Sequence, residues 1–221
     1  MKSLARFKNI HRGEACVVIG NGPSLKEEDV NVLAAKYPTF GSNQIYRLPF
    51  TPTYYVMVDE DMTKACIPLP DEFNPRELFV RAEAGVGNPI YPIVVAGFSV
   101  DFPNFVVMGG TVTYAILQIA FYMGFETMLL VGVDHRYPKA GQMLPGSSFV
   151  ASGDDPDHFV CADGEPYFRE DAIYNAPELE GTTQSYAIAK QLFDQSGRRV
   201  INLTPRTNLD VFEKDSIDNW I

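Results

Sequence analysis

The strongest constraint in the chain is a buried strand that runs into a glycine loop near the amino terminus. Residues 15–19, Ala-Cys-Val-Val-Ile, form an apolar run that ends directly at Gly20. The run does not alternate between apolar and polar positions, so it predicts a strand buried on both faces, as in a parallel sheet. Ser24 and Glu27 have the spacing of a capping box at a helix start. We therefore expect a strand, a glycine loop and a helix that continues to about Lys36.

The rest of the chain continues with strands and helices. Further strands are expected at residues 39–42, 54–58, 77–81, 105–108, 128–131 and 200–203. Apolar residues recur at helical spacing from Val112 to Met123, with Gly124 placed to end that helix, and a last amphipathic helix is expected at about 179–195. This order predicts one Rossmann-like α/β domain over residues 1–221, with a mainly parallel sheet and helices on both faces.

Residues 136–176 form a long segment that interrupts this pattern. The segment is rich in Gly, Pro, Asp and Ser and has no sustained period. It is too long for a simple connection in a compact domain, so we expect it to cover a ligand site.

Composition excludes several classes of protein. The formal net charge of −10 argues against a nonspecific nucleic-acid binder, which needs accumulated Lys and Arg. We expect no transmembrane segment, because no stretch is long and apolar enough, and residues 1–12 do not read as a secretory signal. Cys16, Cys66 and Cys161 form no CxxC pair, which favours reduced thiols in a cytoplasmic protein.

The glycine loop is a candidate phosphate site. It comprises Gly20, Asn21, Gly22, Pro23 and Ser24. Glycines permit close backbone approach, and free amides at a helix start meet an anion with the helix dipole behind them. A glycine-rich turn also serves simply to let a strand enter a helix, and this structural interpretation stays open.

The loop matches neither of the common nucleotide fingerprints. Leu25 stands where the dinucleotide motif needs its third glycine, and no Asp or Glu ends the second strand to hold a ribose hydroxyl. No Gly-Lys-Ser/Thr follows the glycines, so the ATP-type P-loop is absent as well. NAD is therefore disfavoured as a cofactor.

Polar residues follow several of the predicted strands. Asp134 and His135 lie just past the strand at 128–131, and Asn43, Gln44 and Asp59 follow neighbouring strands. Open α/β sheets place their ligands at this carboxyl edge, so these side chains are candidate ligand contacts. Each is also of a type that caps turns, so a capping role remains the alternative.

Two histidines are candidates for acid–base chemistry, because histidine titrates near neutrality without help. They are His135 and His158, whereas His11 is expected to be exposed in the amino-terminal arm. His158 follows the acidic run Asp154-Asp-Pro-Asp157, and a solvated acidic loop is its alternative interpretation. The spacing forms no recognised metal motif, so no metal ligands are assigned.

The motifs together resemble a known family. The carrying segments are Ile19–Leu25, Ser42–Gln44, Gly109–Thr111, Leu130–His135, Asp157–Phe159, Gly197–Arg199 and Asn202–Pro205. In order and spacing they resemble the bacterial branch of the 6-hydroxymethylpterin diphosphokinase-like proteins. The same order is similar to bacterial sialyltransferases that use CMP-sialic acid.

The resemblance implies a modified Rossmann fold that binds a nucleotide and transfers a group. By likeness, the nucleotide is held by residues 20–24, Asn43 and the turn Gly109-Gly110-Thr111. In the sialyltransferases a histidine before the last helix is the general base, and tyrosines steady the leaving phosphate. Tyr137 matches such a tyrosine in place. His158 is the candidate base, although it lies earlier than the family's base, whose place is nearer Asn175 and Glu178.

Three functions are therefore expected as alternatives. The first is a glycosyltransferase-like enzyme that uses a nucleotide sugar, such as a CMP-linked sugar, in cell-surface glycan synthesis, with Asp134, His135, Tyr137 and His158 as candidate catalytic residues. The second is a pterin-type diphosphokinase, which would need Mg²⁺ held by Asp59 and Asp134. The third is a non-catalytic nucleotide-binding accessory protein. The first two differ in their dependence on metal.

The absence of the dinucleotide fingerprint can be tested directly. We expect titration calorimetry with NAD(H) to detect weak binding or none, because Leu25 and the missing ribose acid remove two of the contacts that such sites use. Clear micromolar affinity would contradict the exclusion of dehydrogenase-type sites.

Overall fold

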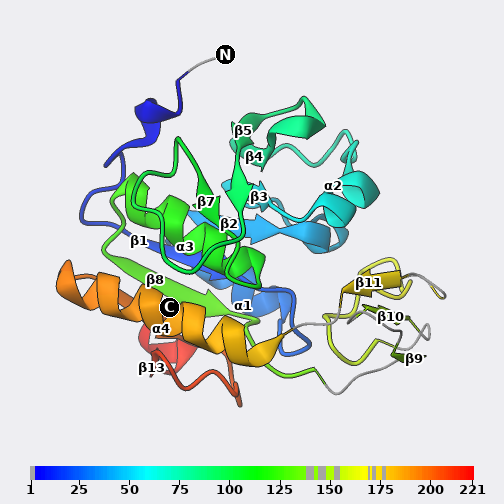
Figure 1. The fold of residues 1–221 in the computed structure, drawn as a ribbon. Coiled ribbons are helices and arrows are strands. Elements are labelled where there is room, and N and C mark those ends of the chain that lie inside the picture. The colour runs from blue at the N-terminus through cyan, green and yellow to red at the C-terminus, as the bar shows by residue number, and fades with distance from the viewer. Residues whose placement is uncertain are drawn as a thin grey trace.

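The fold is built on one parallel sheet with helices on both faces (Figure 1). The computed structural model describes residues 3–137, 142–143, 148–151, 155–168, 170, 173–175 and 178–221. The main sheet has eight strands in the order β13-β12-β8-β1-β2-β3-β4-β5, and all its neighbouring pairs are parallel. The α/β class predicted from the sequence is therefore confirmed.

The strands of this sheet lie close to the predicted segments. They are β1 (Ala15–Ile19), β2 (Thr39–Ser42), β3 (Tyr54–Met57), β4 (Glu77–Arg81), β5 (Asn88–Ile90), β8 (Thr127–Val131), β12 (Arg199–Asn202) and β13 (Glu213–Lys214). Strand β1 pairs with β8 from Ala15↔Thr127 to Ile19↔Val131 and with β2 on its other side. It is central, which explains its unbroken apolar run.

Alternate residues of the strands supply two apolar layers. Val17 and Ile19 of β1 belong to one buried cluster with residues of α1 (Glu27–Ala34) and α2 (Glu60–Cys66). Cys16 and Val18 point the other way, into a cluster with α3 (Val112–Met123) and α4 (Leu179–Gln195). Strand side chains alternate between faces, so one five-residue strand contributes to both layers.

Helix α3 is the best match between sequence and structure. It spans Val112–Met123 as predicted, and Gly124 ends it in the left-handed conformation with φ 93°. Nearly every α3 side chain is buried, including Gln118, because the helix is covered by the sheet on one side and by other segments around it.

Several segments differ from the predictions. The expected strand at 105–108 is only β7 (Val106–Val107), which pairs with β6 (Pro92–Ile93) outside the main sheet. Within residues 136–176, which lacked any period, β9 (Gln142–Met143), β10 (Ser148–Val150) and β11 (Ile173–Asn175) form a small antiparallel sheet. These strands could not be predicted, because the local periodicity of a sequence does not reveal pairing between residues far apart in the chain.

The amino-terminal arm packs against the core of the fold, whereas we expected its His11 to be exposed. His11 is only 8% exposed, and its ring stacks on Phe125 with the centroids 4.3 Å apart. Its Nε2 lies 2.6 Å from the Tyr54 hydroxyl and its Nδ1 lies 2.8 Å from Glu14. The expectation of an exposed His11 was therefore wrong, because the arm packs onto the sheet core.

The order of the strands creates a crevice. From β1 the chain proceeds outward through β2, β3 and β4, and later returns to the other side of β1 with β8 and β12. The direction in which successive strands are added thus reverses between β1 and β8. Open α/β sheets bind their ligands beyond the carboxyl ends of the strands where this direction reverses. No helix among the described residues is long and apolar enough to cross a membrane.

Buried Gln118 supports a testable prediction about the fold. Its Oε1 accepts hydrogen bonds from the amides of Ser99 (2.9 Å) and Val107 (2.8 Å), and its Nε2 donates to the Val107 carbonyl (2.7 Å). Gln118→Leu leaves these buried groups without a partner, so we expect a loss of about 3 kcal/mol or more in urea denaturation. Gln184→Leu, at an exposed position of α4, should change stability by less than about 0.5 kcal/mol. Equal losses of stability in the two variants would contradict the role of Gln118 as a buried hydrogen-bond partner.

Candidate functional site

A cleft lies at the reversal point, beyond the carboxyl ends of β1 and β8. It is lined by Gly20, Asn21 and Gly22 after β1 and by residues 132–137 after β8. The lining also includes Asn43, Gly110–Thr113 at the start of α3, and residues of α4. Asp157, His158 and Tyr167 from the long segment close it on another side. The space within is about 110 Å³, below the ~300–1000 Å³ of typical small-molecule sites. A bound nucleotide would therefore extend from the cleft or widen it.

Asp134 joins the β1 loop to the end of β8. Its carboxylate is 3% exposed and accepts hydrogen bonds from the Ser24 hydroxyl (2.7 Å) and the Ser24 amide (3.3 Å). The Gly22 amide donates to the Gly132 carbonyl (2.9 Å). Asp134, predicted as a catalytic residue, thus has a direct role in shaping the cleft.

The glycines of the loop are required by this close approach. A Cβ atom on Gly20 would lie 2.3 Å from the Gly132 carbonyl oxygen, and one on Gly22 would lie 2.1 Å from Asp134 Oδ2. Such distances exclude any side chain unless the β8 end moves. The loop glycines therefore permit close contact between the β1 loop and the end of β8, and phosphate binding by this loop stays a prediction.

The start of α1 is not arranged to receive an anion. The capping-box prediction was wrong: α1 begins at Glu27, its N-cap is Lys26 without a side-chain cap, and Ser24 bonds to Asp134 instead. Glu27, Glu28 and Asp29 occupy the first turn. These carboxylates complement the helix dipole themselves and would repel a phosphate.

The start of α3 has the opposite character. Gly110, Thr111, Val112 and Thr113 line the cleft, and the first turn of α3 carries no acidic residue. Thr111 is the N-cap, with its hydroxyl accepting from the Thr113 amide (3.4 Å). Amide groups at the start of a twelve-residue helix, with the helix dipole behind them, favour negative charge.

His158 is held in a defined position beside the cleft. Its Nδ1 lies 2.8 Å from Asp155 Oδ2, and the side chains of His158 and Asp155 are 15% and 9% exposed. The ring stacks on Tyr167 with centroids 4.0 Å apart and an interplanar angle of 8°. Burial raises the pKa of Asp155, but the hydrogen bond and charge of His158 outweigh it and lower that pKa overall. The interpretation of His158 as a solvated loop residue was therefore wrong; Asp154 lies outside the described residues.

Tyr137 reaches the same cleft from the end of β8. Burial, and then the charges of Asp157, Asp134 and Asp155, raise its pKa to about 12. The phenol therefore stays protonated at neutral pH and is available as a hydrogen-bond donor.

His135 lies in the left-handed region with φ 53°, and it lines the cleft. Its Nε2 is 2.8 Å from the Thr183 hydroxyl, which donates its own hydrogen to the Leu179 carbonyl. His135 Nε2 must therefore donate, which leaves the lone pair of the neutral ring on Nδ1. Burial lowers the pKa of His135, which favours this neutral form.

Two amide oxygens in the cleft wall lack a partner among the described residues. They are Asn21 Oδ1 and Asn43 Oδ1, whose atoms are buried. The Asn21 amide nitrogen donates to the Ser42 hydroxyl (3.1 Å), which fixes the side chain. Unpartnered acceptors are suited to N–H or O–H groups of a ligand.

Five of the predicted site residues do not line the cleft, namely Pro23, Ser24, Gln44, Asp59 and Gly109. Asp59 instead caps α2, accepting a hydrogen bond from the Met62 amide (2.8 Å). It is thus not brought together with Asp134 to hold Mg²⁺, and the described residues contain no group of three metal-ligating side chains. Glu178, near the place of the expected base, caps α4 through the amides of Glu180 and Gly181.

Sequence reasoning missed Asp155 and Tyr167, the two partners of the His158 ring. The i, i+3 spacing of Asp155 and His158 was a usable signal. The stacking of Tyr167 had no local signal, because it depends on how residues 155–168 fold back.

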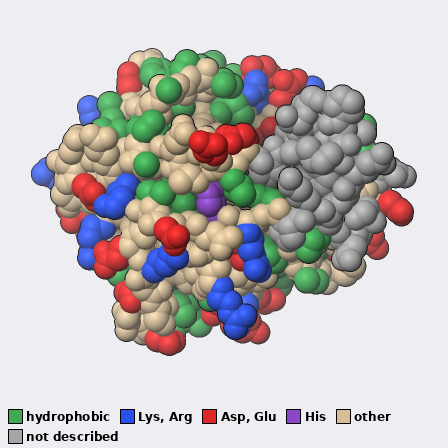
Figure 2. Space-filling view, turned by 60° about the horizontal axis from the view of Figure 1, so that its bottom comes forward, with side chains coloured by type: hydrophobic (Ala, Val, Ile, Leu, Met, Phe, Trp, Pro, Cys, Tyr) green, Lys and Arg blue, Asp and Glu red, His purple; other side chains and the backbone are tan. Residues whose placement is uncertain are grey.

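On the face drawn in Figure 2, the described Lys and Arg side chains are interspersed with Asp and Glu. They form no continuous basic surface there, in keeping with the net charge of −10.

Comparisons with known proteins give little help. No protein-family model matches the chain, and no curated protein matches it by sequence. Among solved structures, the chain is similar to the sialyltransferase CstII from Campylobacter jejuni, solved in complex with the substrate analogue cytidine-5'-monophosphate. The match has 13% identity and a TM-score of 0.45 and covers 92% of this chain and 85% of the other. The family resemblance of the motifs stays a prediction.

Substitution of Gly22 tests the geometry of the cleft. Gly22→Val places side-chain atoms against Asp134, so we expect loss of nucleotide-induced thermal stabilisation in a protein that still folds. Gly197→Val is the control: φ is 68° there, but a Cβ meets nothing within 4 Å, so only backbone strain of about 1–2 kcal/mol is introduced. Unchanged ligand stabilisation in Gly22→Val would show that this loop is not part of the site.

Proposed function

We propose that this chain is a nucleotide-dependent transferase of glycosyltransferase type, which moves a glycosyl group from a nucleotide sugar to an acceptor hydroxyl. The observation that carries the proposal is the Asp155–His158 pair facing the same cleft as the start of α3 and the Tyr137 phenol. A base, a proton donor and an anion-binding helix end are the three groups that such a transfer uses. A role in cell-surface glycan synthesis rests on the sequence resemblance alone.

The donor phosphate binds at the start of α3 in this proposal. The amides of Gly110 and Val112 and the helix dipole favour negative charge there, while the acidic first turn of α1 disfavours it. Asn21 Oδ1 and Asn43 Oδ1 accept hydrogen bonds from hydroxyl or amino groups of the donor.

His158 acts as the general base. The acceptor O–H gives its proton to Nε2 while the oxygen forms a bond to the anomeric carbon, and the bond from that carbon to the phosphate oxygen breaks. The electron pair leaves with the nucleotide phosphate. Asp155 holds Nδ1 and stabilises the imidazolium that forms.

Tyr137 assists the departing phosphate. With its pKa at about 12 the phenol keeps its proton throughout the neutral range. It donates a hydrogen bond to the phosphate oxygen as negative charge develops, together with the α3 amides.

The donor class is tested by ligand-induced stabilisation. A ligand that binds only the native state raises the melting temperature, so CMP-sugars, other nucleotide sugars, ATP and NAD can be compared with and without Mg²⁺. The proposal expects stabilisation by a nucleotide sugar. Stabilisation by ATP that requires Mg²⁺ would favour the diphosphokinase alternative instead.

Removal of His158 tests the catalytic role. Once the donor that raises the melting temperature and its acceptor are identified, His158→Ala should lower kcat by about 10²- to 10⁴-fold with little change in nucleotide affinity. Asp155→Asn should lower kcat as well, because the imidazolium loses its negative partner.

His135→Ala is the matched comparison, because His135 lines the same cleft. Wild-type turnover in His158→Ala together with loss of turnover in His135→Ala would transfer the role of base to Nδ1 of His135. Wild-type turnover in both variants would remove histidine from the mechanism.

A further inference from the structure

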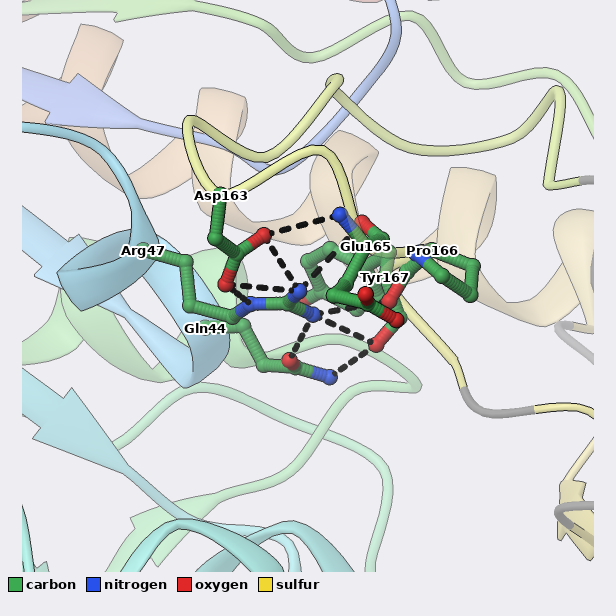
Figure 3. Close-up of polar contacts among 6 residues, drawn as sticks. All are labelled: Gln44, Arg47, Asp163, Glu165, Pro166 and Tyr167. Atoms are coloured by element: carbon green, nitrogen blue, oxygen red, sulfur yellow. Dashed lines mark hydrogen bonds and ion pairs between the residues drawn. The ribbon is translucent and has the colours of Figure 1, made fainter.

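Arg47 fastens the segment that carries His158 to the body of the fold. It is the last residue of the short 3-10 helix Asn43–Arg47 that follows β2. Its Nε and Nη2 form a fork on the Asp163 carboxylate, at 3.1 Å to Oδ2 and 2.8 Å to Oδ1 (Figure 3). The Arg47 side chain is 13% exposed and the Asp163 side chain is 51% exposed, so this pair is shielded from solvent on the arginine side only.

The same guanidinium also holds the backbone beyond Asp163. Nη1 donates to the Pro166 carbonyl (2.8 Å) and to Gln44 Oε1 (3.0 Å), and Nη2 donates to the Glu165 carbonyl (3.3 Å). The Gln44 amide in turn donates to the Tyr167 carbonyl (2.6 Å). Figure 3 shows these partners gathered around one side chain. Only the planar, five-donor group of arginine can make such a set of bonds.

Tyr167, at the end of this network, is the stacking partner of His158. One face of the Tyr167 side chain meets the His158 ring in the cleft. Tyr167 also lines a separate cavity of about 730 Å³ together with Tyr46, Cys66 and Phe168. The Tyr167 side chain is 4% exposed and packs against Phe159 and Phe168, while the bonds from Arg47 and Gln44 fix the Pro166 and Tyr167 carbonyls and so the backbone that carries the ring.

We propose that Arg47 is a positioning residue, which sets the orientation of the His158 ring through Tyr167. The inference rests on the proposed function, in which His158 is the base. Loss of the Arg47 clamp lets residues 163–167 shift toward the cavity, and His158 then loses its stacked support. Apart from this stacking, the His158 ring is held by Asp155 at Nδ1 and by an edge-to-face contact with Phe168, which lies next to Tyr167 on the same segment.

Histidine NMR tests the clamp without any need for activity. A ring proton stacked on an aromatic face is shielded, and the His158 signal is identified as the one missing from His158→Ala. We expect this signal to move downfield in Arg47→Ala and in Arg47→Lys, since lysine cannot reproduce the fork. Should Arg47→Ala fail to fold, Asp163→Ala removes the other half of the pair and should give the same shift.

Turnover gives the second readout. A misplacement of about 1 Å can lower a rate about 100-fold, so Arg47→Ala should lower kcat about 10- to 100-fold with unchanged nucleotide affinity. In the His158→Ala background the same change should have no further effect, because Arg47 acts only through that ring.

Arg6→Ala is the matched control. Arg6 also bridges distant segments, through Glu77 and Asn88 (both 2.9 Å), but it does not line the cleft. It should lower stability and leave both the His158 signal and kcat unchanged. An unmoved His158 signal in Arg47→Ala, or an effect on kcat that adds to that of His158→Ala, would overturn the role of Arg47. Full turnover in His158→Ala would instead refute the proposed base, and the NMR shift would still decide whether Arg47 orients the ring.

Discussion

The contact between the β1 loop and the end of β8 is the constraint on which the site depends. The Asp134 carboxylate bonds to Ser24 across this contact, and Gly20 and Gly22 leave no room for a side chain between the two segments. Because the winding of the sheet reverses here, the contact defines the floor of the cleft and directs Tyr137 and His135 into it. Asp134, which the sequence suggested as a catalytic residue, thus holds the β1 loop against the end of β8.

The two helix starts near this contact have different roles. Helix α1 follows the glycine loop in sequence, but its first turn is acidic and the Ser24 amide before it is bonded to Asp134. Helix α3 starts far along the chain, yet its uncharged first turn opens on the cleft. In the proposed function, the start of α3 therefore binds the anion and residues 155–168 supply the acid–base group.

The sequence predicted what local pattern and strand order determine. Strands such as β1, and helix α3 with its terminal glycine, follow from hydrophobic runs and periods. The convergence of Asn43, Asp134 and His135 follows from parallel strands sharing one edge. The sequence could not predict that Ser24 bonds to Asp134 rather than capping a helix, since both uses need only a hydroxyl. Nor could it place Tyr167 on His158 or Asp163 on Arg47, because these pairs depend on how a segment without a period folds back.

In the proposed function, a nucleotide phosphate binds at the start of α3 and not at the start of α1. Backbone amide chemical shifts during titration with CMP test it most directly, because each helix start reports separately. We expect large shifts for Gly110, Thr111 and Val112, and none for Glu27, Glu28 and Asp29. Large shifts at residues 27–29, with Gly110–Val112 unmoved, would contradict it.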